Sequence, residues 1–199
     1  MPGWIFLRHG QSEANVERWL SGWVDSPLTG LGRKQAAEAK RVCSAWPIER
    51  AYSSDLSRAV DTAQIVLQGR SLSFKRSSKL RERNMGEWAH KSLDVVRAEG
   101  LSHRLTDWNG APPGGESNAQ LGWRVLTYLA ALPPISGNTL IVAHGGLIRV
   151  VLGLVDSQPY SEIGKTVIQN CVPHVRELLE DGFHELLLKH KNACSSGEE

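Results

Sequence analysis

Two histidines in this 199-residue chain each follow a short apolar run and are followed by glycine. His9 comes after residues 4–7 and Arg8, and His144 comes directly after residues 139–143. Such runs predict strands that are buried on both faces. Because ligands bind beyond the carboxyl ends of the strands of a parallel sheet, we expect both imidazoles at one ligand-binding edge. For each histidine taken alone, the alternative is a structural role in the core.

Arg8 and His9 together suit attack on a phosphorus centre. A neutral nitrogen of His9 can approach phosphorus in line while the Arg8 guanidinium holds the anionic oxygens through charge-assisted hydrogen bonds. Gly10 would let the backbone come close to the anion, and Asn15 would add a neutral donor. The first fifteen residues therefore predict a phosphate site.

Arg58 and Glu82 supply two further groups that phosphate-ester chemistry needs. Arg58 is expected in the first turn of a helix capped by Ser54 or Asp55, where free amides and partial positive charge favour an anion. The alternative for Arg58 is an ion pair with Asp61, one turn on. Glu82 is a candidate general acid for a leaving alkoxide, and the alternative is a carboxylate in a charged surface. A basic stretch around Glu82 would favour a polyanionic substrate or would form a solvated charged face; it consists of Lys75, Arg76, Lys79, Arg81, Arg83 and Lys91.

Helical segments between the two histidine-bearing strands must position these groups. Strands that alternate with helices predict a three-layer α/β/α sandwich around a mostly parallel sheet. The first expected elements are a helix from a Thr29 cap to about residue 45, a short strand over residues 51–53 and the helix that carries Arg58. A capping box of Ser117 and Gln120 begins the next helix, which Pro133 and Pro134 end. The last helix of this series is expected over residues 146–154.

The C-terminal part of the chain predicts a hairpin. Residues 172–179 and 183–189 are apolar enough for two strands, and the Glu-Asp-Gly at residues 180–182 is typical of the turn between them. We expect a single domain over residues 1–191, with a flexible tail at residues 192–199. Residues 86–115 are the least regular segment and are expected to form a lid or an insertion.

Composition restricts the class of protein. With 41% hydrophobic and 22% charged residues the chain is expected to fold, and a net charge of +2 gives no reason to expect a nucleic acid or a membrane as partner. No secretory signal or membrane-spanning run is recognisable, so the cytoplasm is the expected compartment. Three widely spaced cysteines, Cys43, Cys171 and Cys194, predict neither a disulfide framework nor a metal site.

From Trp4 to about Leu154 the chain resembles the histidine phosphatase superfamily, also called the phosphoglycerate mutase-like family. The motifs that carry this resemblance are Leu-Arg-His-Gly-Gln-Ser-Glu-Ala-Asn at residues 7–15, Ser-Gly-Trp-Val-Asp-Ser-Pro-Leu-Thr-Gly-Leu-Gly at 21–32, Ser-Ser-Asp-Leu-Ser-Arg-Ala at 53–59, Leu-Arg-Glu at 80–82, Gly-Glu-Ser at 115–117 and Val-Ala-His-Gly-Gly at 142–146.

The resemblance implies a role for each of these groups. His9 would be phosphorylated transiently and Glu82 would be the proton donor. The phosphate would be held by Arg8, Arg58 and His144, with Asn15, Gly145 and the Ser21–Gly22 loop closing the pocket. Neither a metal nor an organic cofactor is implied.

Within the family, residues 80–88 favour hydrolysis over phosphoryl transfer to a sugar acid. Their pattern, Leu-Arg-Glu-x-x-x-Gly-x-Trp, is similar to the small phosphatase branch that includes alpha-ribazole phosphatase, whereas mutases typically have Arg-His-Tyr-Gly after the acid. Ala89-His90 departs from the Glu-Gly that usually follows in that branch.

We therefore expect a metal-independent phosphoric monoester hydrolase of the histidine acid phosphatase type, whose partner is a small phosphorylated metabolite. The alternatives are a cofactor-dependent phosphoglycerate mutase and a non-catalytic module that binds phospho-ligands. Pairing of two chains into a homodimer through the exposed edge of the C-terminal hairpin is left open.

Overall fold

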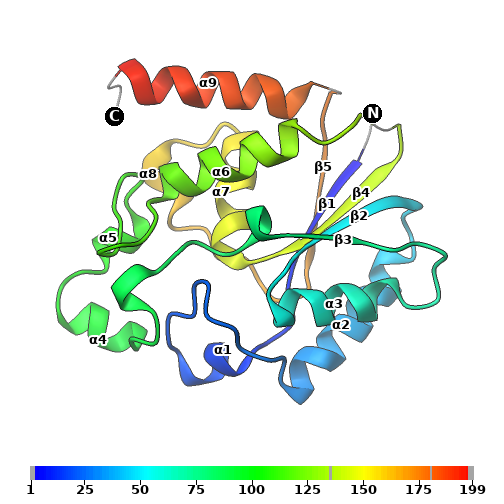
Figure 1. The fold of residues 1–199 in the computed structure, drawn as a ribbon, viewed down its shortest axis with the longest axis horizontal. Helices are drawn as coiled ribbons and strands as arrows, with labels where there is room; N and C mark the ends of the chain where they lie inside the picture. The colour runs from blue at the N-terminus through cyan, green and yellow to red at the C-terminus, as the bar shows by residue number, and fades with distance from the viewer. Residues whose placement is uncertain (1–2, 135, 180, 197–199) are drawn as a thin grey trace.

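A central sheet organises the fold (Figure 1). The computed structural model describes residues 3–134, 136–179 and 181–196, and within them the sheet has five strands in the order β3-β2-β4-β1-β5. Strands β3, β2, β4 and β1 are parallel, and β5 is antiparallel to β1. The strands are β1 (Gly3–Arg8), β2 (Ile48–Ser54), β3 (Lys75–Ser77), β4 (Asn138–Ala143) and β5 (Pro173–Glu177).

The pairing of β1 with β4 brings the two histidines to the same edge. Leu7 lies opposite Val142 and Arg8 lies opposite Ala143, so the residue that follows each strand is a histidine at the same level. The His9 amide extends the ladder by donating to the Ala143 carbonyl oxygen at 3.0 Å. The two apolar runs therefore form adjacent buried strands, as the sequence predicted.

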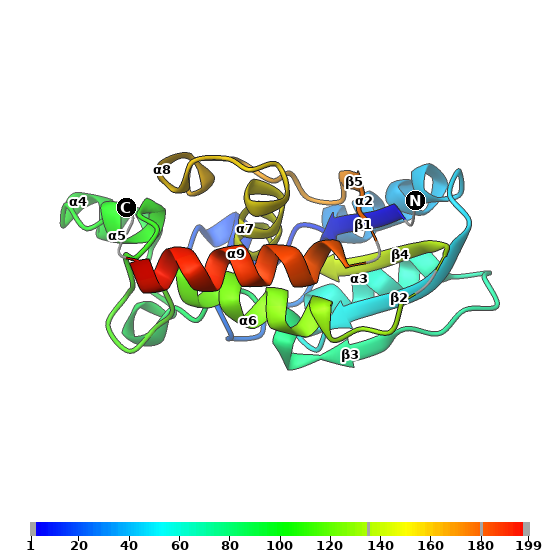
Figure 2. The same ribbon diagram turned by 90° about the horizontal axis from the view of Figure 1, so that it is seen from above.

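Helices cover both faces of the sheet (Figure 2). The side chains of β1 alternate between the two faces and so contribute to two separate cores. Ile5 and Leu7 pack with α2 (Gly30–Cys43) and α3 (Ser57–Leu67). Trp4 and Phe6 face the other core, which is formed with α6 (Asn118–Ala130), α7 (Gly145–Val155) and α9 (Gly182–Ser196). The short elements are α1 (Glu13–Glu17), η1 (Ser78–Leu80), η2 (Gly86–Trp88), α4 (Leu93–Ala98), α5 (His103–Thr106) and α8 (Tyr160–Ile163).

Two of the predicted caps are confirmed. The Thr29 side chain accepts a hydrogen bond from the Gly32 amide at 3.0 Å and begins α2. Ser117 and Gln120 form the reciprocal capping box that begins α6. Both caps satisfy amides that the first helical turn leaves without an intrahelical partner.

The predicted cap of α3 is wrong. The capping position is Leu56, which lies two residues after Ser54 and one after Asp55, and the helix begins at Ser57. The Asp55 carboxylate instead accepts two hydrogen bonds from Arg81, at 2.8 and 2.7 Å. A bidentate pair with a guanidinium is stronger than a single capping hydrogen bond, so Asp55 is held by Arg81 rather than by the helix.

The C-terminal hairpin is also wrong, because its second arm is the helix α9 and β5 pairs with β1 instead. Phe183, Leu186, Leu187 and His190 recur at helical spacing, and they face α6 and the core behind it. The Phe183 ring meets Trp4 edge-on with the centroids 4.6 Å apart. The helix continues to Ser196, so the expected boundary at residue 191 falls inside it; residue 180 in the predicted turn and residues 197–199 of the predicted tail lie outside the described residues.

None of the helices in the described ranges combines the length and the apolar character that crossing a membrane requires.

The docking of α9 predicts very different costs for two substitutions on that helix. Phe183 is 4% exposed, so Phe183→Ala is expected to lower the free energy of unfolding by about 3–5 kcal/mol. Leu188 on the same helix is 49% exposed, and Leu188→Ala is expected to change it by no more than about 0.5 kcal/mol. Urea unfolding of both variants measures these changes in the free energy of unfolding, and equal losses in the two variants would contradict this packing.

Candidate active site

The predicted catalytic residues meet at the carboxyl ends of β1 and β4. The ring centroids of His9 and His144 lie 5.1 Å apart with the rings steeply inclined. His9 is 4% exposed and His144 is fully buried. Arg58 is 1% exposed, and its charge acts on both imidazoles. Residues separated by more than a hundred positions in the chain therefore form one cluster.

Local backbone geometry determines which nitrogen of His9 can react. Nδ1 lies 2.7 Å from the carbonyl oxygen of Gly10. Because a carbonyl oxygen only accepts, Nδ1 carries the proton and Nε2 carries the lone pair. Gly10 also has to be a glycine, since an added Cβ would lie 2.3 Å from the carbonyl oxygen of Gly32 in α2. The chain thus fixes both the tautomer and the position of the ring.

The two arginines are anchored by backbone carbonyls, and in each of them Nε remains for another partner. Arg8 Nη1 donates to the Ile168 carbonyl oxygen at 2.6 Å. Arg58 donates to the carbonyl oxygens of Gly22 and Val24 at 2.9 and 3.0 Å. The Nε atoms of both side chains are buried and have no hydrogen-bond partner in the described part of the chain. Buried N–H groups of this kind are suited to a ligand anion.

The alternative for Arg58, an ion pair with Asp61, is not what forms. Arg33 of α2 takes that partner, with Nη2 2.9 Å from the carboxylate. Arg58 points instead to the loop after α1, and Asp25 at 3.9 Å is the carboxylate near it.

His144 is the least satisfied polar group at this edge. Neither of its ring nitrogens has a hydrogen-bond partner among the described residues, although both are buried. A buried imidazole without partners costs free energy in the unliganded protein. This arrangement disagrees with the alternative of a core histidine satisfied by backbone and fits a residue that contacts a ligand.

The electrostatic surroundings keep both imidazoles neutral. Burial, reinforced by the charges of Arg58 and Arg8, holds the pKa of His9 well below its ordinary value of 6.5. Burial and the same two arginines also lower the pKa of His144 well below 6.5. A neutral His9 has its nucleophilic lone pair available at neutral pH.

Glu82 reaches the site by capping α7, the helix that follows His144. Its carboxylate accepts from the amides of Gly146 and Leu147 at 2.9 and 3.2 Å. A Cβ on Gly146 would lie 2.4 Å from Glu82 Oε1, so this close approach requires glycine. The carboxylate also interacts electrostatically with Arg8 and Arg58, which places it beside the cluster.

Residues 82–88 are held by groups that the sequence reasoning did not assign. Glu116 accepts two hydrogen bonds from Arg124, at 2.7 and 2.8 Å, and one from the Asn84 amide at 2.9 Å. The backbone carbonyl of Glu82 accepts from Trp23 Nε1 at 2.7 Å and from Arg124. The Gly-Glu-Ser motif marked Glu116 without a role; its role here is to position the loop of Glu82.

The predicted pocket-closing residues lie around the same cluster. Gly22 has a φ of +49°, which glycine adopts readily, and its carbonyl oxygen binds Arg58. Ser21 closes this turn, with its carbonyl oxygen 2.7 Å from the amide of Val24. Asn15 lies in the first turn of α1, where its Oδ1 accepts from the amide of the capping residue Ser12 at 3.2 Å. The same Oδ1 accepts from Asn170, which also donates to the His9 carbonyl oxygen at 2.8 Å. Asn170 had no recognisable signal in the sequence, because it lies outside every motif.

The segment predicted as a lid or an insertion supports the loop before Ser21. Leu20 exchanges backbone hydrogen bonds with this segment, donating to Lys91 at 2.9 Å and accepting from His90 at 3.0 Å. The Trp19 ring stacks on His90 with the centroids 4.9 Å apart. His90 and Lys91 of this segment therefore hold the backbone that leads into the Ser21–Gly22 turn.

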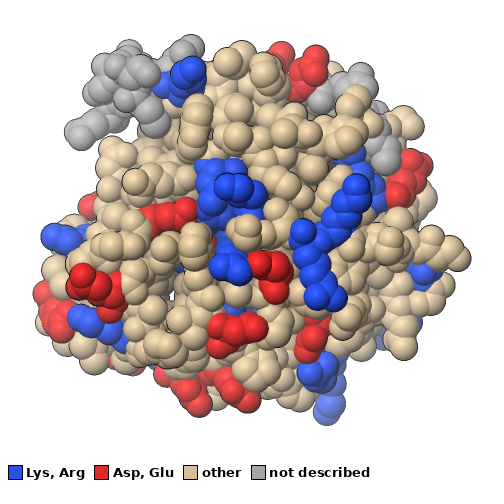
Figure 3. Space-filling model, in the orientation of Figure 1, with Lys and Arg blue, Asp and Glu red and all other residues tan. Residues whose placement is uncertain are grey.

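Two more arginines, one buried and one half-buried, border Glu82. Arg83 is 2% exposed, and Arg149 lies one turn after Gly145 in α7. The sequence had grouped Arg83 with the basic stretch, but the stretch does not form one surface. Arg81 pairs with Asp55 and Arg83 turns inward, while the Lys and Arg side chains that gather over α6 and β3 have acidic neighbours (Figure 3).

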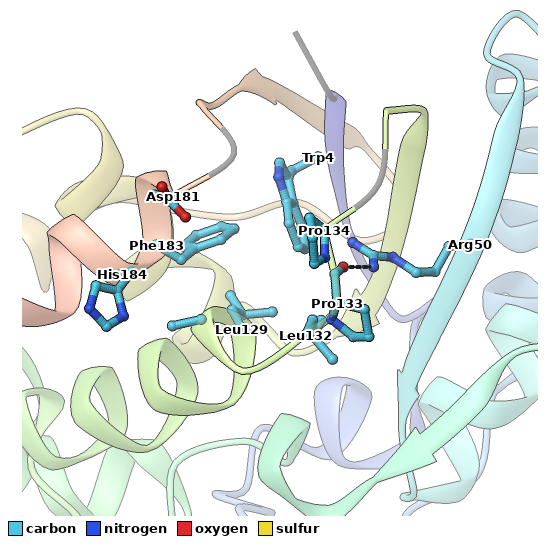
Figure 4. A pocket seen from close by; sticks show the side chains of 10 residues that line it. Trp4, Arg50, Leu129, Leu132, Pro133, Pro134, Asp181, Phe183 and His184 are labelled. Atoms are coloured by element: carbon cyan, nitrogen blue, oxygen red, sulfur yellow. Dashed lines mark hydrogen bonds between the residues drawn. The ribbon is translucent and has the colours of Figure 1, made fainter.

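A separate cavity opens at the other ends of the strands, so it has no part in this cluster (Figure 4). It is lined by Trp4 at the start of β1, by Phe183 of α9 and by Arg50, which donates to the Pro133 carbonyl. The described residues contain no group of three or more His, Cys, Asp or Glu side chains that could hold a metal ion.

Comparison with known proteins agrees with this geometry. The model of the histidine phosphatase superfamily (branch 1) matches residues 4–190. The chain belongs to this family. The 2,3-bisphosphoglycerate-dependent phosphoglycerate mutase 2 of Gloeobacter violaceus is 32% identical over 196 residues, covering 92% of this chain and 90% of that protein.

Relatives of this histidine phosphatase family member also include phosphatases. The adenosylcobalamin/alpha-ribazole phosphatase of Salmonella typhimurium is 32% identical over 166 residues, covering 80% of this chain and 82% of that protein. The structure of a mycobacterial glucosyl-3-phosphoglycerate phosphatase complexed with VO3 superposes with a TM-score of 0.80 at 29% identity, over 88% of this chain and 92% of that chain. These comparisons confirm the resemblance to the histidine phosphatase superfamily that the motifs indicated. They also confirm the predicted α/β/α sandwich.

The lowered pKa values predict that His9 and His144 stay neutral well below pH 6.5. Titration of the ring protons by NMR should give both midpoints below the value of about 6.5 found in an unfolded chain. Arg58→Met removes a positive charge that lowers the His9 pKa, so that midpoint should rise. Since the unfolded chain binds more protons in this window, the free energy of unfolding should fall as the pH drops below about 6.5. A His9 midpoint at or above 6.5 would contradict the assigned electrostatics.

Proposed function

We propose that this protein is a metal-independent phosphomonoesterase that hydrolyses small phosphate esters through a phosphohistidine on His9. The observation that supports it most directly is the hydrogen bond from His9 Nδ1 to the Gly10 carbonyl oxygen, because it leaves Nε2 with its lone pair inside a cluster of guanidinium groups. A neutral, oriented imidazole surrounded by fixed positive charge is what attack on a phosphate dianion requires.

In the first step, Nε2 forms a bond to phosphorus while the bond from phosphorus to the ester oxygen breaks. The Nε groups of Arg8 and Arg58 and one N–H of His144 donate to the non-bridging oxygens, together with the amide of Gly145 at the start of α7. These donors stabilise the charge that spreads over the oxygens in the transition state.

Glu82 handles the protons in both steps. As a protonated acid it gives its proton to the leaving alkoxide, and as a carboxylate it then accepts one from the water that attacks the phosphohistidine. The second step breaks the bond between nitrogen and phosphorus, releases inorganic phosphate and restores neutral His9.

A phosphoglycerate mutase is the second candidate, because the relative from Gloeobacter violaceus carries that name at the same 32% identity as the phosphatase from Salmonella typhimurium. Both activities form the phosphohistidine. They differ in the molecule that accepts the phosphoryl group from it, which is water for the phosphatase and a phosphorylated sugar acid for the mutase. The pattern of residues 80–88 favours hydrolysis.

The role of His9 predicts complete loss of turnover in His9→Ala. Wild-type protein should release phosphate from p-nitrophenyl phosphate in the presence of EDTA and should form an acid-labile phosphoryl adduct. His9→Ala should show neither and should still bind phosphate esters. Turnover that survives this substitution would refute the nucleophile, and binding without turnover in the wild type would favour the non-catalytic module.

The same preparations separate the two catalytic candidates. Conversion of 2-phosphoglycerate to 3-phosphoglycerate, primed by 2,3-bisphosphoglycerate and faster than phosphate release, would identify a mutase. Phosphate release without exchange is the result expected here.

Gly146→Ala is predicted to impair proton donation. The added Cβ would meet Glu82 Oε1 at 2.4 Å and displace the carboxylate from the amides of Gly146 and Leu147. We expect kcat for an alkyl phosphate to fall by about 10²-fold or more, and kcat for p-nitrophenyl phosphate to fall less, because its leaving group needs little protonation. Gly30→Ala is the matched control, since a Cβ there meets no atom within 4 Å. Equal losses for both substrates would argue against Glu82 as the donor.

A further inference from the structure

The Arg58 side chain is held by a turn, residues 21–24, that belongs to no helix or strand. The carbonyl oxygens of Gly22 and Val24 accept from Arg58 at 2.9 and 3.0 Å, while its Nε has no partner in the described part of the chain. On one side this turn is held by Trp23, whose Nε1 donates to the Glu82 carbonyl oxygen at 2.7 Å. The direction in which Arg58 presents Nε therefore depends on how the other side of the turn is held.

A short antiparallel pairing holds that other side. Leu20 donates to the Lys91 carbonyl oxygen at 2.9 Å and accepts from the His90 amide at 3.0 Å. The Arg18 carbonyl oxygen accepts from the Leu93 amide at 2.9 Å. We call the paired residues 18–20 and 90–93 the clamp. It ends directly before the turn, so its position sets the position of the turn.

Two residues of the clamp have a backbone conformation that side chains rarely adopt. Arg18 has a φ of +59° and His90 a φ of +68°, in the left-handed region that favours glycine. Such conformations cost free energy and persist only where the surrounding contacts hold them. The clamp therefore needs side-chain contacts to stay closed.

The contact that most directly opposes this strain is a pair of stacked rings. The Trp19 ring lies on the His90 ring with the centroids 4.9 Å apart and the planes inclined by 20°. Arg18 also pairs with Asp94 at 2.9 Å, but both side chains are more than half exposed, and a pair of this kind contributes little. Because Trp19 is half-buried and His90 is exposed, the stack adds little to the cores and acts mainly on the clamp.

We propose that Trp19 and His90 are positioning residues of the phosphate site. Their stacked rings keep the clamp closed, the closed clamp fixes the turn of residues 21–24, and the carbonyl oxygens of Gly22 and Val24 then aim Arg58 at the phosphate. This inference rests on the proposed function for its meaning in catalysis. Neither ring takes part in the transfer of the phosphoryl group or of a proton.

The clamp acts on the affinity for phosphate and not on the chemical step. Without the stack the clamp is open in a larger fraction of molecules, and the apparent affinity falls in proportion to the fraction that stays closed. Saturating substrate selects the closed form again, so kcat is unaffected. The free energy of one aromatic pair limits the loss of affinity to about tenfold.

Trp19→Leu tests the clamp, because it removes the stacked ring and keeps the strained backbone. Binding of inorganic phosphate, measured by calorimetry, should weaken about threefold to tenfold. Trp19→Phe can still stack and should bind phosphate nearly as tightly as the wild type. With p-nitrophenyl phosphate as substrate, Trp19→Leu should raise KM by the same factor as it weakens phosphate binding and should leave kcat unchanged.

Trp46→Leu is the matched control. Trp46 is also half-buried, but it packs against the core beneath α2 and precedes β2, at the opposite edge of the sheet from the phosphate site. Its replacement should lower the urea midpoint of unfolding at least as much as Trp19→Leu does, and it should leave the affinity for phosphate unchanged.

Two double variants show through which residues the stack acts. Glycine adopts a φ of +68° readily, so His90→Gly keeps the pairing of the clamp without the ring. Adding Trp19→Leu to His90→Gly should therefore change the affinity for phosphate no further. In Arg58→Met, whose weaker binding of phosphate is followed by NMR, Trp19→Leu should also have no effect.

Phosphate binding as tight in Trp19→Leu as in the wild type would overturn the role of the clamp, and so would equal losses of affinity in Trp19→Leu and Trp46→Leu. Neither comparison requires Arg58→Met to fold. A wild-type protein that binds phosphate without hydrolysing esters would refute the proposed function and leave the phosphate affinities to decide the role of the clamp. A wild-type protein that binds no phosphate would refute both.

Discussion

Parallel pairing between β1 and β4 is the constraint on which the site depends. Its register places Arg8 opposite Ala143, so both strands end at the same level and both deliver a histidine beyond the sheet. The hydrogen bond from the His9 amide to the Ala143 carbonyl oxygen extends this pairing to the proposed nucleophile. A slip along either strand would separate the two imidazoles by the rise of a strand residue, and the shared edge would be lost.

Uncompensated positive charge is the second property of this edge. Four arginines approach one carboxylate, and several of their nitrogens, like both nitrogens of His144, are buried without partners in the described residues. Such groups destabilise the unliganded protein, and the two apolar cores on either side of the sheet hold them in place. The same unpartnered donors make the site complementary to an anion, because a ligand would accept hydrogen bonds from groups that are already oriented.

Glu82 shows how one side chain serves both the fold and the proposed chemistry. By accepting from the first amides of α7 it fixes the start of the helix that follows His144, and it thereby stands beside the phosphate site. Its backbone is held in turn by Trp23 and Arg124, which join the α1 loop and α6 to the same point. A relative named as a mutase and one named as a phosphatase are each 32% identical to this chain, so overall identity does not distinguish the two activities.

The sequence by itself determined β1, β2 and β4, the caps of α2 and α6 and the motif residues, because apolar runs and capping side chains act through near neighbours in the chain. It was wrong at Asp55 and at the C-terminal helix, where contacts with Arg81 and with the Trp4 face of the sheet override local preference. Only the tertiary structure decided the His9 tautomer, the inward turn of Arg83 and the part played by Asn170. The tautomer depends on the direction of the neighbouring Gly10 carbonyl, and the other two depend on burial and contacts between segments far apart in the chain, none of which leaves a local signal in the sequence.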